Sequence, residues 1–114
     1  MKSFWISLVA VFLVILITAR AQTNKERTAE SLAKKSGCFD CHGPANKDFG
    51  PSFSDMTAKF KKDTTIRASY FDAIRNGSKG NWSSDITRGV PMPRYTGRLS
   101  DDDINKLVAW LVTL

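Results

Sequence analysis

Five consecutive residues, Cys38 to His42, combine two thiols and an imidazole in the order C-x-x-C-H. Two thiols three positions apart lie on one helical turn, so both can add to the vinyl groups of one haem and form thioether bonds. The imidazole that follows the second thiol is then held beneath the ring, where its nitrogen binds iron. The pattern predicts one covalently attached haem c, with Cys38 and Cys41 as attachment points and His42 as a metal ligand.

Other uses of this motif fit the sequence less well. A thioredoxin-like redox site would need a βαβ setting, and no such pattern is present. A zinc site normally has four protein ligands, whereas the chain contains two cysteines and one histidine in all. A disulfide between Cys38 and Cys41 would leave the adjacent histidine without a purpose.

A second axial ligand would decide what the haem does, and methionine is the natural candidate. Met92 lies between two prolines, which stiffen the backbone on both sides of the thioether. A soft thioether opposite an imidazole stabilises ferrous iron and raises the reduction potential. Met56 has helical spacing from neighbouring phenylalanines and is expected in the core. Met92 is therefore the expected second metal ligand, and an ordinary loop methionine is the alternative.

The start of the chain has the composition of a targeting segment. Lys2 is positive, residues 4–17 are apolar apart from one serine, and residues 19–21 read Ala-Arg-Ala. This order is typical of a secretory signal peptide over residues 1–21, which leaves residues 22–114 as one mature domain. The apolar segment spans about 21 Å as a helix, against about 30 Å of membrane hydrocarbon. An uncleaved membrane anchor is the alternative.

The charge of the chain is mildly basic. It has 17 Lys and Arg against 11 Asp and Glu, and removal of Lys2 and Arg20 leaves a net charge of +4. The basic residues are scattered or paired, without the long runs or interleaved aromatics of nucleic-acid-binding proteins. The positive residues nearest the cysteines and Met92 suggest steering toward an acidic partner, or else ordinary solvated side chains. They are Lys34, Lys35, Lys47, Arg94 and Arg98.

Sequence periodicity predicts an all-α fold. Helices are expected over residues 24–36, 55–61 and 65–76, and a last helix is capped by Ser100 and carries apolar residues at helical spacing. The first of these has a face of small residues suited to close helix packing. Residues 77–97 are rich in glycine, proline and polar residues and are expected to form a long structureless connection. No segment alternates like a strand.

The ordered set of motifs resembles the class I monohaem cytochromes c, in their short bacterial periplasmic branch. The resemblance spans most of residues 22–114. It rests on Lys35 to His42, Lys47 to Pro51, Ala58 to Phe60, Ile74 to Trp82, Val90 to Pro93, and Leu99 to Trp110.

The resemblance implies a small fold of about four helices around one covalently bound haem, with the terminal helices crossing near Leu32 and Trp110. It implies His42 and Met92 as axial ligands and the carbonyl of Pro51 as acceptor for the second His42 ring nitrogen. It also implies three haem-pocket walls and an indole donor to a haem propionate. The walls are Phe60, Ile74 and Leu107, and the indole donor is Trp82.

Two features depart from the family pattern. Residues 83–90 make the approach to Met92 longer than expected. The family often has a cation that meets a propionate just before the Ile74 position, but this chain has Ala73 there. Arg75 or Arg88 would be the substitutes.

The functional hypothesis is a periplasmic electron carrier, a monomer that exchanges single electrons with redox partner proteins. It would not be an enzyme, because filled axial positions leave no place for a small-molecule substrate. A haem subunit of a redox enzyme, acting for example on peroxide or sulfur compounds, is the first alternative. A sensing protein in which a small molecule displaces Met92 is the second.

Overall fold

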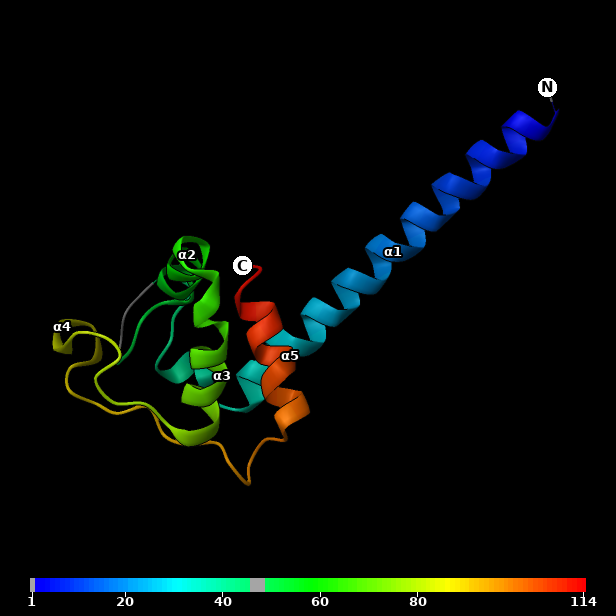
Figure 1. Cartoon of the computed structure of the whole chain (residues 1–114). Helices are drawn as coiled ribbons and strands as arrows, with labels where there is room; N and C mark the ends of the chain where they lie inside the picture. Colours follow the sequence, from blue (N-terminus) through cyan, green and yellow to red (C-terminus); the bar gives the residue numbers. More distant parts are fainter. Residues whose placement is uncertain (1, 46–48) are drawn as a thin grey trace.

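The computed structural model describes residues 2–45 and 49–114 (Figure 1), and over these it is all-α, as predicted. Isolated bridges pair Ser78 with Met92 and Thr96 with Leu99. The helices are α1 (Lys2–Lys35), α2 (Phe53–Lys62), α3 (Arg67–Asn76), α4 (Ser84–Thr87) and α5 (Asp101–Leu111), with 3-10 turns at Cys38–Asp40 and Thr64–Ile66.

The C-terminal part of α1 packs against α5, which confirms the predicted crossing of the terminal helices (Figure 1). Ala29 and Ala33 of α1 are 3% and 0% exposed, and their small side chains let the two helices approach closely. Leu32 packs at the edge of this core and Trp110 is buried in it. The predicted apolar positions of α5 are all buried: Ile104, Leu107, Val108 and Leu111.

The sequence predicted a helix that begins at Asn24, but helix α1 runs unbroken from Lys2 to Lys35. Residues 1–36 contain neither glycine nor proline, so nothing in the sequence interrupts the helix between its apolar and polar parts. The apolar half extends away from the helical domain (Figure 1), and its large side chains, such as Phe4 and Trp5, are exposed. None of the helices, over the residues described, is long and apolar enough to cross a membrane.

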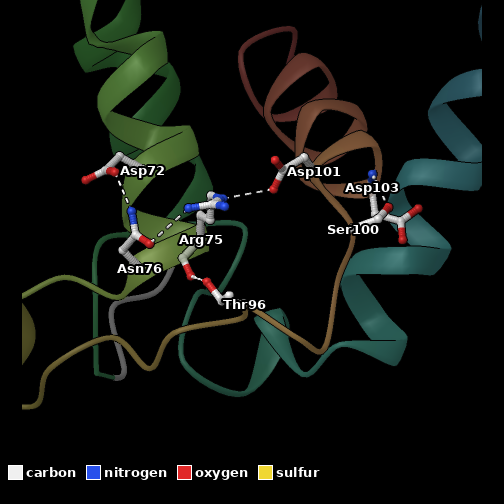
Figure 2. A network of polar contacts seen from close by, with 7 residues as sticks. All are labelled: Asp72, Arg75, Asn76, Thr96, Ser100, Asp101 and Asp103. Carbon is white, nitrogen blue, oxygen red and sulfur yellow. Dashed lines mark hydrogen bonds and ion pairs between the residues drawn. The ribbon is translucent and has the colours of Figure 1, made fainter.

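The other helix boundaries differ from prediction where a polar side chain caps the chain. Helix α2 begins at Phe53, two residues early, because the Ser52 hydroxyl accepts the Asp55 N–H at 3.0 Å. Asp63 accepts the Thr65 N–H, and a 3-10 turn precedes α3. The Ser100 cap of α5 is confirmed (Figure 2): its hydroxyl accepts the Asp103 N–H at 3.1 Å.

Two buried hydroxyls tie α2 to its neighbours. Thr57 faces the carbonyls of Phe53 and Leu111 at 2.9 and 3.0 Å, which joins α2 to α5. The Tyr70 hydroxyl donates to the Met56 carbonyl at 2.8 Å, which joins α3 to α2. Met56 is 8% exposed, so the prediction that it packs in the core is confirmed.

Tyr70→Phe is expected to lower the free energy of unfolding by about 1 kcal/mol near neutral pH, because the Met56 carbonyl loses its buried donor. Burial raises the pKa of Tyr70 from 10.0 to about 12. The neutral phenol is therefore favoured in the folded state, and its contribution is complete below pH 10 and lost as pH rises toward 12. Denaturant unfolding of both proteins across this range measures the effect. A gap between them that does not narrow with pH would contradict this account.

Candidate haem site

A cavity of about 340 Å³ lies among the end of α1, helices α2, α3 and α5, and the segment that carries Met92. Phe60 is the one predicted site residue that does not line it; this side chain is half-buried and packs against the hydrophobic core instead. The other predicted residues all line this one cavity: Cys38, Cys41, His42, Pro51, Ile74, Trp82, Met92 and Leu107.

The two thiols are positioned by a tight turn after α1. Gly37 adopts a left-handed conformation with φ of 79°, which glycine tolerates readily, and the chain then enters the Cys38–Asp40 turn. The Cys38 carbonyl accepts the His42 N–H at 3.0 Å, which keeps His42 on the same turn, and both cysteines and His42 line the cavity. Both thiols are free and half-buried, and burial raises the pKa of Cys38.

The imidazole of His42 is oriented from two directions. Its Nδ1 lies 2.8 Å from the Pro51 carbonyl, which only accepts, so Nδ1 carries the proton and Nε2 keeps its lone pair for iron. A Cβ on Gly50 would lie 2.7 Å from the ring Cε1, so the ring packs directly on the Gly50 backbone. Burial lowers the pKa of His42 and favours the neutral form that ligates metals.

The backbone of Met92 is fixed by two hydrogen bonds to Ser78. Its N–H donates to the Ser78 carbonyl at 2.8 Å, and its carbonyl accepts the Ser78 N–H at 3.1 Å. Gly77 has φ of 82°, and a Cβ there would lie 2.9 Å from the Met92 carbonyl oxygen. The expectation of a structureless segment over residues 77–97 was therefore wrong at this bridge and at α4.

Several cavity residues were missed by sequence reasoning. Tyr95 is 7% exposed, and its hydroxyl donates to the Ser36 carbonyl at 2.9 Å, while its N–H donates to the Ile74 carbonyl. These bonds join the segment after Met92 to α1 and α3. The sequence feature that could have identified Tyr95 is its position as an aromatic residue in a polar segment, three residues after Met92. Met56 also lines the cavity, from the core side.

Neither arginine named as a substitute propionate partner lines the cavity. Arg75 is drawn to the start of α5, where its Nε lies 2.9 Å from the Asp101 carboxylate (Figure 2). The guanidinium of Arg88 lies over the Phe49 ring, 5.5 Å from its centroid. Among the described residues, the cations that line the cavity are instead Lys59 and Lys79.

The cavity suits a haem chemically. Its walls are mostly aliphatic and aromatic, and they gather two thiols, a thioether and an imidazole whose second nitrogen is already bonded to the protein. The Gly50 and Gly77 backbones leave room that a side chain would fill against His42 and against the Met92 backbone. This donor set is that of a c-type haem site.

Comparison with known proteins agrees with this chemistry. A sequence model of the family described as "Cytochrome C oxidase, cbb3-type, subunit III" matches residues 24–111. Cytochrome c-551 of Pseudomonas denitrificans is 34% identical over 87 residues, which cover 76% of this chain and 98% of the relative. The chain belongs to the class I c-type cytochromes.

Solved structures extend the likeness of this cytochrome to its fold. Wild-type cytochrome c552 of Nitrosomonas europaea has a TM-score of 0.62 and 32% identity, over 74% of this chain and 96% of that one. A Class 1 cytochrome of Sideroxydans lithotrophicus has a TM-score of 0.59 and 25% identity, over 75% of this chain and 90% of that one. These small cytochromes are matched over nearly their whole length.

Family membership assigns the cofactor and the activity. The cytochrome carries one covalently bound haem c, and it is an electron-transfer protein rather than an enzyme. When bound, the haem supplies a single iron-centred one-electron couple. The residues of this chain bury the ring, orient the ligands and exclude water.

Proposed function

We propose that this cytochrome shuttles single electrons through a haem whose axial ligands are His42 and Met92. The observation that carries the proposal is that both residues line one cavity and each is fixed by hydrogen bonds, at the His42 ring and at the Met92 backbone. Ligands held in this way change little when the iron gains or loses an electron, which favours rapid transfer. With both axial positions filled, no small-molecule substrate binds the metal.

The remaining site roles follow from position at the cavity. The Pro51 carbonyl fixes the tautomer of His42 and raises its basicity as a ligand. Cys38 and Cys41 are the thioether attachment points, Ile74 and Leu107 are walls, and Trp82 is the indole donor to a haem carboxylate. Phe60 would act from behind this wall, as part of the core on which α2 packs.

We infer a periplasmic location, reached through a signal peptide over residues 1–21. The apolar part of α1 makes no part of the core, so its removal would leave the α1–α5 packing at Ala29 and Ala33 in place. The haem-binding domain would then be residues 22–114.

The mature protein is expected to begin at Gln22 and to be recovered from the soluble periplasmic fraction of the producing cells. Cleavage after Ala21 follows the A-x-A rule for signal peptides. Intact mass spectrometry of the haem-containing protein measures the start. Recovery in the membrane fraction, with a mass that includes Met1 to Ala21, would support the anchor instead.

We propose that redox partners dock through acidic surfaces and that the cytochrome itself is a monomer. Lys34 and Lys35 precede the thioether turn, Arg94 and Arg98 follow Met92, and all four are exposed. Part of this charge is already engaged, since Lys34 pairs with Glu30 at 2.9 Å and Arg98 lies over the Tyr95 ring. Lys47, the fifth predicted member, lies outside the described residues.

Electron transfer to an acidic partner is expected to slow as ionic strength rises, because salt screens exposed charges beyond a Debye length of about 8 Å at physiological strength. Stopped-flow mixing across a salt series measures the rate, and a neutral small-molecule reductant serves as the control. Size-exclusion chromatography over the same series tests the monomer. Rates that are equally flat with both reductants would remove the steering role from these residues.

A further inference from the structure

The described lining of the haem cavity contains two lysines, Lys59 and Lys79, and no acidic side chain. A cavity lined by one sign of charge favours a ligand group of the opposite sign. The two propionate carboxylates of a haem are such groups, and a carboxylate held away from water needs both hydrogen bonds and a counter-charge.

Lys59 brings its charge to one side chain already placed at this cavity. Its Nζ lies 4.5 Å from the centroid of the Trp82 ring, a distance at which the ring face attracts an ammonium ion. Lys59 is on α2, whereas Trp82 is on the segment that leads to Met92. Across the described part of the chain, the indole N–H of Trp82 has no hydrogen-bond acceptor. An ammonium group and an unused N–H donor therefore meet at the same part of the lining.

The other cations near the site are engaged or less well held. Arg75 is paired with Asp101 and Arg88 lies over Phe49, so neither reaches the cavity. Lys79 lines the cavity from an exposed turn outside any helix. These placements leave Lys59 as the cation fixed both by a helix and by a ring contact.

Asp63 is close enough to Lys59 to interact with its charge, but this carboxylate does not line the cavity. Hydrogen bonds from Thr65 lower the pKa of Asp63, and the charge of Lys59 adds to this as the smallest cause. That carboxylate accepts the N–H and the hydroxyl of Thr65 at 3.0 and 2.6 Å, in an exposed turn after α2.

We propose that Lys59 is the counter-ion of the haem propionate for which the family resemblance already implies Trp82 as the donor. Lys59 then takes the place of the cation that is missing at Ala73. This inference rests on the proposed function, because it requires the haem to occupy this cavity. A positive charge beside the ring disfavours the more positive ferric state, so Lys59 raises the reduction potential.

The test compares three variants of the intact haem protein: Lys59→Gln, Lys59→Arg and, as a matched control, Lys61→Gln. Lys61 is an exposed residue of the same helix and does not line the cavity, so its loss changes the net charge equally. Reduction is measured against a mediator of fixed potential. Lys59→Gln is expected to shift this equilibrium about threefold toward the ferric form, which is about 28 mV for one electron. Lys59→Arg and Lys61→Gln should each remain near the wild type.

Equal shifts in Lys59→Gln and Lys61→Gln would overturn the proposal, because net charge alone would then set the potential. A shift in Lys79→Gln with none in Lys59→Gln would also overturn it. Because Lys59 is exposed, its variants are expected to fold, and thermal unfolding checks this. A wild-type protein without covalent haem or methionine ligation would contradict the proposed function instead, and its absorption spectrum separates that failure from a failure of Lys59.

Discussion

The double variant Cys38→Ala/Cys41→Ala is expected to lose all haem that survives denaturation. Both thiols line the cavity and are free to form thioethers, whereas bonds from iron to side chains break when the chain unfolds. Haem staining after denaturing electrophoresis measures retention, and an immunoblot of the same gel confirms that polypeptide is present.

The single variants Cys38→Ala and Cys41→Ala serve as matched controls, because each keeps one attachment point. They are expected to retain haem at the protein band in smaller amounts. A band that stains in the double variant as it does in the wild type would show that the cofactor is attached elsewhere.

Met92→His is expected to lower the reduction potential by at least about 59 mV, while haem and fold are kept. This is about a tenfold shift of the redox equilibrium toward ferric iron. Imidazole donates more strongly to ferric iron than a thioether does, so the ferric state is favoured. The backbone bonds between Ser78 and Met92 do not involve the side chain and should survive the change. Redox titration of the purified protein measures the potential.

The control for this prediction is Met56→Leu, because Met56 also lines the cavity but lies in the core. A change between side chains of similar volume should cost less than about 1.5 kcal/mol of stability and leave the potential nearly unchanged. If Met56→Leu moved the potential and Met92→His did not, Met56 would be the ligand.

Local sequence patterns predicted the parts of the molecule that depend on neighbours in the chain. The C-x-x-C-H order places both thiols and the imidazole on one turn, and the structure has that turn. Helix α5 was predicted from its Ser100 cap and its apolar spacing, both of which are present. The ring bond from His42 to Pro51 was implied by the family resemblance, and its 2.8 Å distance agrees.

Features that depend on residues distant in the chain were missed. Tyr95 appeared as one aromatic in a polar segment, because its bond to Ser36 crosses 59 positions. Arg75 has the charge a propionate partner needs, but its Nε is paired with the carboxylate of Asp101 at the start of α5. The family resemblance implied Phe60 as a wall residue, whereas the side chain packs against the hydrophobic core and does not line the cavity.

The start of α1 illustrates a different limit. Asn24 has the chemistry of an N-cap, but an N-cap begins a helix only where the residues before it are not helical. The residues before Asn24 include neither glycine nor proline, and the helix continues through it.

We propose that this cytochrome exchanges one electron at a haem held between His42 and Met92. A spectroelectrochemical titration of the purified protein, followed in the absorption band that reports sulfur-to-iron ligation in the ferric form, tests it most directly. One reversible transition with a one-electron slope is expected, with the band present in the ferric protein and lost on reduction. A ferric spectrum without that band, together with binding of an added small ligand such as cyanide at low concentration, would contradict it.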